Sequence, residues 1–291
     1  METVLEKTPS ISLERGKKKY KIKKKDHSQK YIWGTLFIFL AAFVYFVCFM
    51  CEYKWDQVRL DLVQKFVGQF FAITSVPLEN WIKIFSTLLN TLLLSIVTTI
   101  VSIVIGLFLG LFSARNLSNP ILCTIIRGFA GFIRAVPTII WVLLFVSGFG
   151  LTATTALVGM CFHSVAYFIK SYSEAFEEVN DGTLEALRAT GASWWQIVIN
   201  AVLPSSFTRL LSWIAMRSEM NFAAAVVIGP AVGVPGTIGS LINKCGREGN
   251  YAFMGACILM IILAALALNF LLLDLNRNQS LVKDKQICNK N

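Results

Sequence analysis

Charged side chains are scarce in this chain of 291 residues: they make up 15% of it, while 55% of the residues are hydrophobic. Soluble domains usually carry about a quarter charged residues. Apolar runs of about 18 or more residues recur, and each is long enough to cross a membrane as a helix. Strict alternation of apolar and polar residues is missing, which argues against a membrane barrel. The composition therefore predicts an all-α, polytopic membrane protein.

Residues for catalysis and metal binding are also few. The two histidines are His27 and His163, and neither an H-E-x-x-H nor a G-x-S-x-G motif occurs. An intramembrane enzyme needs a nucleophile with its base, or a cluster of metal ligands. Cys48 and Cys51 form a C-x-x-C, but no second pair follows at the spacing of a metal site. We therefore expect no catalytic residues and no metal.

Lysine and arginine gather at the ends of the chain, with ten in residues 1–30. Beside a membrane span, such a basic head is expected to be a disordered cytoplasmic anchor that contacts anionic lipid and binds no nucleic acid. Most of the 27 Lys and Arg then fall on the same side, which predicts that both termini are cytoplasmic. The predicted spans are 31–51, 84–112, 126–149, 154–171, 207–230 and 251–273.

A polar segment at 174–204 separates the fourth and fifth predicted spans. Its pattern predicts a helix, a tight turn at Gly191 and a second helix that Ser193 caps. We expect Gly191 to allow a sharp turn where a Cβ would hinder close backbone approach. We expect Pro204 to break the chain before the fifth span. Taken alone, this segment could be an ordinary cytoplasmic helical hairpin.

The spacing of five residues makes the segment more specific: Glu185, Ala186, Gly191, Leu203 and Pro204. It resembles the EAA loop of ABC-importer membrane permeases that depend on a binding protein. The version Glu185–Ser193 is similar to that of phosphonate-importer permeases, as are Arg134–Pro137 and Glu219 with Asn221. The resemblance covers about 84–273, while residues 1–30 and 31–83 (the first span with its extracytoplasmic loop) and the basic tail 274–291 carry no motif.

The resemblance implies one N-terminal helix plus a five-helix permease core in the cell membrane. Two permease chains, identical or paired, would bind two cytoplasmic ATPase subunits through a coupling helix at about 183–193. An extracytoplasmic binding protein would deliver the solute. The chain has no Walker A sequence, so ATP would bind the partner and the chain itself would need no cofactor. Glu185 would stabilise the coupling helix or pair with a basic group of the ATPase.

Two departures from the phosphonate pattern leave the solute open. Ala223 stands where Arg is usual, and 229–239 reads GPAVGVPGTIG in place of a compact glycine-rich turn. The resemblance favours phosphonate or a related phosphorus oxyanion. Another small organic solute is the alternative, and an ion-coupled carrier or channel is a third reading.

Polar residues inside membrane spans are expensive, so they are candidates for a transport pathway or gate. Arg217 and Glu219 are such residues, with a structural pair as the alternative. Arg134 could instead be an interfacial anchor, His163 an ordinary interior residue, and the glycines an outer turn. The pathway and gate candidates are Glu219, Asn221, Arg134, Pro137, His163, Gly233 and Gly236.

Overall fold

Helices dominate the computed structural model, which describes residues 12–15, 18–21, 28–50 and 60–288. The chain forms two units, Met1–Leu60 and Asp61–Asn291, each considered by itself. In the first unit, α1 (Ser28–Tyr45) continues into the π-helical η1 (Phe46–Met50). Gln29–Phe49 is long and apolar enough to cross a membrane, in agreement with the first predicted span.

The basic head contains a short strand pair, which differs from its predicted disorder. Within it, β1 (Ser12–Arg15) and β2 (Lys18–Lys21) pair antiparallel, and Glu14 stands opposite Lys19. Opposite charges across a strand pair favour pairing. The second cysteine of the C-x-x-C, Cys51, lies outside the described residues.

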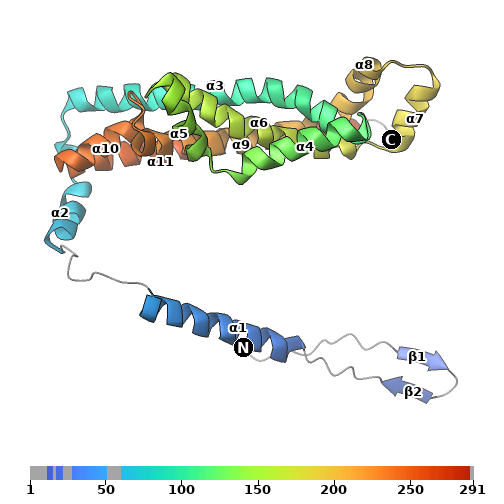
Figure 1. Ribbon diagram of the computed structural model, residues 1–291, viewed down its shortest axis with the longest axis horizontal. Coiled ribbons are helices and arrows are strands. Elements are labelled where there is room, and N and C mark those ends of the chain that lie inside the picture. The colour runs from blue at the N-terminus through green and yellow to red at the C-terminus, as the bar shows by residue number, and fades with distance from the viewer. Residues whose placement is uncertain (1–11, 16–17, 22–27, 51–59, 289–291) are drawn as a thin grey trace. The chain divides into compact units, whose positions relative to one another are not determined.

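The second unit is an all-helical bundle (Figure 1). Its elements in chain order are α2 (Leu60–Phe70), η3 (Ile73–Ser75), α3 (Leu78–Ser113), α4 (Pro120–Ala135), α5 (Thr138–Phe149), α6 (Ala153–Glu177), α7 (Asp181–Ala189), α8 (Trp194–Ile197), η4 (Val198–Val202), α9 (Leu203–Val232), α10 (Ile238–Glu248) and α11 (Tyr251–Cys288).

The predicted number of six membrane-crossing helices is not confirmed. In the part of the chain that the structure describes, four helical stretches are long and apolar enough to cross a membrane: Gln29–Phe49, Leu78–Ser113, Trp194–Val232 and Tyr251–Leu272. The bent pair of α4 and α5 makes a fifth if it counts as one span. The predicted span at 154–171, which lies in α6, is not among them.

Packing explains why α6 is less apolar than a lipid-facing span. It packs against α3, α4, α5 and α9 and runs through the middle of the bundle in Figure 1. Small and polar side chains such as Ser164 and Ser171 are buried on it. Polar and small residues serve helix contacts inside a membrane bundle, so hydropathy underrates an enclosed helix.

The third span predicted at 126–149 is not one continuous helix. The axes of α4 and α5 differ by 91° at a break after Ala135. Pro137 is the N-cap of α5, and Val136 before it is extended, as residues preceding proline prefer. The indole Nε1 of Trp141 donates to the Ile133 carbonyl at 3.0 Å and bridges the break.

Two helices were not expected. α2 lies in the loop predicted at 52–81, and its Phe66 ring packs edge-on to Tyr251 at 5.4 Å. α10 follows the Gly- and Pro-rich segment and packs on α3, α9 and α11. Figure 1 shows both at the end of the bundle opposite α7. The glycine-rich segment is thus a tight turn followed by a helix.

Candidate functional site

The polar segment at 174–204 folds through local contacts, as the sequence predicts. Asn180 caps α7 by accepting from the Gly182 amide at 2.8 Å. Leu184 is buried, whereas Glu185 and Ala186 are exposed. Asp181 is the acidic residue of the first turn, and Glu185 lies one turn further on. Helix-dipole stabilisation acts mainly within the first turn, so the position of Glu185 favours contact with a partner.

Gly191 is required for a different reason from the one predicted. No atom of the chain lies within 4 Å of a Cβ added there, so close backbone approach is not the cause. Its φ of +80° is the left-handed conformation that glycine adopts at no steric cost. Gly191 therefore ends α7 by its backbone angle and leaves an open surface.

The prediction that Pro204 breaks the chain is wrong. Ser193 caps α8 in a full capping box with Gln196, which confirms the predicted cap. The helix then widens into the π-turn η4 and continues as α9, where Pro204 occupies the first turn. Proline has no amide to donate, so the continuous helix lacks one backbone hydrogen bond here and is not ended by it. α8 is therefore an extension of α9 and not a separate surface helix.

Polar contacts tie this segment to the turn between α3 and α4. Arg188 Nη2 donates to the Asn116 carbonyl at 2.6 Å, and Trp194 Nε1 donates to the Leu117 carbonyl at 2.8 Å. Trp194 also stacks on Phe112 with ring centroids 5.6 Å apart. These bonds satisfy backbone carbonyls that the short turn leaves free.

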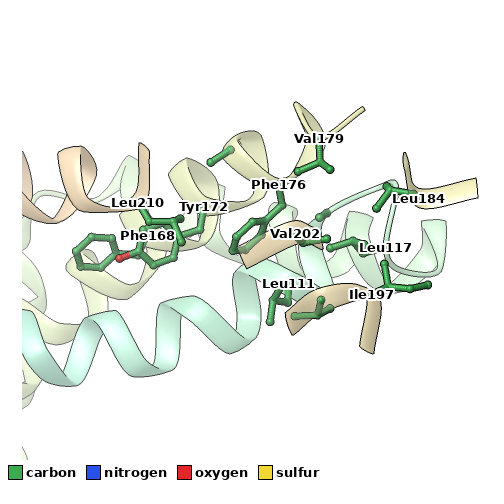
Figure 2. Close-up of a cluster of buried hydrophobic side chains, with 13 residues drawn as sticks. Leu111, Leu117, Phe168, Tyr172, Phe176, Val179, Leu184, Ile197, Val202 and Leu210 are labelled. Atoms are coloured by element: carbon green, nitrogen blue, oxygen red, sulfur yellow. The ribbon is translucent and has the colours of Figure 1, made fainter. Parts of the chain in front are cut away.

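A buried apolar cluster underlies the segment and joins it to α3, α6 and α9 (Figure 2). Its labelled members are Leu111, Leu117, Phe168, Tyr172, Phe176, Val179, Leu184, Ile197, Val202 and Leu210. Leu203 is half-buried against it, while Pro204 is exposed. The five predicted coupling residues thus lie on one segment that packs on this cluster, and Glu185, Ala186 and Gly191 are at its exposed surface.

Ion pairs surround the same end of the bundle. Arg127 Nη2 lies 2.5 Å from Glu177 Oε1, which also accepts from the Arg115 amide at 2.7 Å. Arg209 pairs with Glu178. Sequence reasoning missed these partners because they come from helices about 30 to 60 residues apart along the chain.

The pathway candidates divide into two groups. Glu219 is exposed on α9, and Asn221 is 1% exposed. Asn221 Nδ2 donates to Thr99 Oγ1 at 2.9 Å, and its Oδ1 accepts from Ser164 Oγ at 2.7 Å. Arg217 Nε and Nη2 donate to the same Ser164 oxygen at 3.2 and 2.9 Å. These four side chains form a buried relay across α3, α6 and α9.

Arg134 and Pro137 lie beside the break between α4 and α5, where Arg134 is exposed. His163 of α6 is half-buried and lies against the Val136 carbonyl. The charges of Arg134 and Arg217 both act on His163. The structure thus brings together residues that the sequence holds about 80 positions apart.

The glycine candidates serve a helix crossing at the far end. Gly233 and Gly236 have φ of +84° and +75° and form the turn between α9 and α10. A Cβ on Gly229 would lie 2.7 Å from the Ser240 amide, and one on Gly239 would overlap the Val226 carbonyl. Gly229 and Gly239 therefore allow the backbones of α9 and α10 to pack closely. A gate role for Gly233 and Gly236 stays a prediction.

Within the described ranges, no group of three or more His, Cys, Asp or Glu residues could hold a metal ion.

A family model defines the class of protein. The model described as "Binding-protein-dependent transport system inner membrane component" matches residues 103–279. The chain belongs to this family of transport permeases, which confirms the resemblance found in the loop. The chain is therefore a multi-pass membrane component of a transport system.

Two curated relatives refine the comparison. The chain is 30% identical over 157 residues to the phosphate-import permease of Mycolicibacterium smegmatis (strain ATCC 700084 / mc(2)155), covering 54% of this chain and 29% of that protein. It is 34% identical over 157 residues to a phosphite transport system permease of Stutzerimonas stutzeri, covering 54% and 56%. The chain thus spans about half or less of the length of these relatives.

Solved structures share the fold. An inward facing conformation of a methionine ABC transporter aligns with 70% of this chain and 99% of its own, with a TM-score of 0.62 and 21% identity. A bacterial ABC transporter involved in alginate import aligns with 86% of this chain at a TM-score of 0.58 and 14% identity. At these identities the likeness concerns the fold alone.

Proposed function

We propose that the chain is the transmembrane permease subunit of an ATP-driven importer for a small phosphorus oxyanion. A separate cytoplasmic ATPase drives it through α7, and an extracytoplasmic binding protein delivers the solute. Two permease chains pair around the pathway, and both termini face the cytoplasm. ATP binds the partner, so this chain carries no cofactor and catalyses no hydrolysis.

The exposed face of α7 carries this proposal. Glu185, Ala186 and Gly191 are solvent-facing, yet the segment behind them packs on a buried apolar cluster with α3, α6 and α9 and is hydrogen-bonded to the turn between α3 and α4. A rigid exposed helix on a buried base transmits displacement, whereas a flexible loop would absorb it. A partner that moves α7 would therefore move α3, α6 and α9 with it.

The solute class rests on the curated relatives. Their names specify phosphate import and phosphite transport, and both solutes are tetrahedral phosphorus oxyanions. The polar cluster around Arg217 supplies positive charge inside the bundle, which suits an anion. Phosphonate, phosphite and phosphate share this chemistry, and competition between them ranks the three.

Reconstitution of the chain with its ATPase and binding protein in proteoliposomes tests the function. We expect ATP-dependent uptake of radiolabelled phosphite, phosphate or methylphosphonate, and no uptake of methionine. Uptake that continues without the ATPase would overturn the mechanism. ATP-dependent uptake of methionine alone would overturn the solute class and leave the permease class standing.

A charge reversal tests the docking surface separately. Glu185→Arg should abolish co-purification of the ATPase while the protein still inserts into the membrane, because the exposed carboxylate makes no ion pair within the described ranges. Glu248→Arg is the matched control, since Glu248 is an exposed glutamate of α10, and α10 lies at the other end of the bundle from α7 in Figure 1. Equal loss in both variants would count against a docking role for α7.

A further inference from the structure

Arg217 is an unusual cation because it is buried near the middle of a membrane helix. Its residue is 4% exposed, and its guanidinium lies over the Tyr167 ring at 5.0 Å. Nε and Nη2 donate to Ser164, whereas Nη1 has no acceptor among the described residues. The guanidinium thus has donors left over that a further partner can accept from.

No carboxylate of the described chain neutralises this charge. Glu219 follows two residues later on the same helix, about 200° around the axis, and is exposed on another face. Glu174 acts electrostatically on Tyr167 and is itself 3.7 Å from Lys170. The interpretation of Arg217 and Glu219 as a structural pair is therefore wrong, and the positive charge is uncompensated.

Further positive potential gathers at the same place. Arg134 acts electrostatically on Arg217, and both act on His163. The N-terminus of α5 begins at the same break, and its cap residue Pro137 supplies no side-chain acceptor. A helix N-terminus carries a partial positive charge and free amides. Two cations and a helix N-terminus thus lie around His163.

A polar atom beside the cluster also lacks a partner. Trp213 Nε1 is enclosed, and no hydrogen-bond partner is found for it in the described structure. Trp213 packs edge-on to Tyr167 with ring centroids 6.1 Å apart, and Arg217 lies over the same ring, so this donor is near the guanidinium. Buried polar groups are normally satisfied, and an unsatisfied donor beside an unpaired cation points to a missing acceptor.

We propose that Arg217, together with Arg134, His163 and the α5 N-terminus, binds a tetrahedral phosphorus oxyanion inside the bundle during import. This deepens the proposed function by assigning a solute site within this chain. Arg217 offers its free Nη1 edge to two oxygens of the anion, as guanidinium groups do with phosphate. Arg134, which is exposed, supplies the second charge and the route of approach.

The depth of the site separates a transported anion from a lipid headgroup. Arg217 lies fourteen residues after Leu203, or about 21 Å along the 30-residue α9. Lipid phosphates lie at the membrane interfaces, about 15 Å or more from the middle of the hydrocarbon core. A solute that crosses the membrane along α9 must pass the level of Arg217, whereas lipid phosphates stay at the interfaces.

The relay holds the guanidinium in place. Ser164 accepts two hydrogen bonds from Arg217 and donates one to Asn221, which in turn donates to Thr99. Asn221 is therefore a positioning residue for Arg217 and not a surface of the pathway. Because the relay joins α3, α6 and α9, movement of these helices changes the direction of the guanidinium.

Direct binding to the purified chain in nanodiscs tests the site without the ATPase or the binding protein. We expect saturable binding of radiolabelled phosphate, competed by phosphite and methylphosphonate. Arg217→Gln should weaken it about tenfold or more, and Arg217→Lys by less, because lysine keeps the charge and loses the fork. Lys244→Gln, which removes a cation from an exposed pair on α10, should leave binding unchanged.

Arg134→Gln provides the second variant should Arg217→Gln not fold, because the Arg134 side chain is exposed. It should also weaken binding severalfold. Unchanged binding in both arginine variants, or no saturable binding to the unsubstituted chain, would overturn the site. ATP-driven uptake of a phosphorus oxyanion together with either of those results would leave the proposed function intact and remove this inference alone.

Discussion

The cations at the α7 end of the bundle are paired with acceptors, whereas the cation in its middle has no carboxylate partner within the described structure. At the end, Arg127 and Arg209 pair with glutamates, and Arg188 donates to a backbone carbonyl. At mid-depth, Arg217 has a hydroxyl and a ring as neighbours but no carboxylate within the described structure. The paired cations fix the architecture, and the unpaired one is available for a ligand.

The two regions also differ in the kind of side chains that pack in them. The α7 segment lies on an apolar cluster of large side chains, whereas the relay consists of small polar side chains that depend on one another. Apolar packing tolerates modest change, but a hydrogen-bonded network loses several partners when one member is removed.

Gly191→Asp should have the largest effect: loss of uptake with normal membrane insertion. No atom of the chain meets a side chain at this position, so a functional loss points to a partner that approaches the open turn. Radiolabelled solute uptake measures the effect. Gly249→Asp is the matched control, with φ of +69° and equally open space at the end of α10. Normal uptake by Gly191→Asp would contradict docking at this turn.

Gly239→Ala should lower the free energy of unfolding by about 3 kcal/mol, because the added methyl overlaps the Val226 carbonyl. Chemical denaturation in detergent measures the loss. Gly246→Ala on the same helix is the control, since its nearest neighbour is Met254 Sδ at 3.7 Å. An equal and small effect at both positions would show that α9 and α10 separate easily.

Ser164→Ala should lower the free energy of unfolding by about 2 kcal/mol, because Arg217 and Asn221 both lose their partner in a buried site. Ser206→Ala removes one buried hydroxyl bond, to the Ala175 carbonyl, and should cost about half as much. The same denaturation experiment compares the two. A smaller effect at Ser164 would mean that the relay is not a coupled network.

Arg127→Gln should have the smallest effect, about 1 kcal/mol, because the pair with Glu177 is about a quarter exposed on each side. Added salt should reduce the difference between this variant and the unsubstituted protein. A loss as large as that of Ser164→Ala would show that this ion pair carries more of the fold than its exposure indicates.

Sequence reasoning found the α7 segment because its signals are local. A cap, a glycine and a proline act within a few residues of each other, so Ser193 and the turn at Gly191 were predicted. The break at Pro137 was missed because the apolar run continues through it. Proline marks the position, but only packing decides whether a span kinks or turns through a right angle.

The relay could not be predicted from the sequence. Thr99, Ser164 and Asn221 are common residues on three helices, and their meeting depends on rotation of each helix about its axis. The signal that did exist was Arg217, a charge inside an apolar run. Hydropathy likewise underrated α6, whose surface meets protein on most sides.

The π-turn η4 sets the rotation about the helix axis between the residues before it and the residues after it. A π-turn inserts about one residue into the helical repeat, and one residue rotates everything that follows by about 100°. Trp194 before it points to the α3–α4 turn, and Arg217 after it points to α6. Deleting one residue from Val198–Val202 would therefore keep α7 and α8 seated on the α3–α4 turn while turning the Arg217 guanidinium away from α6.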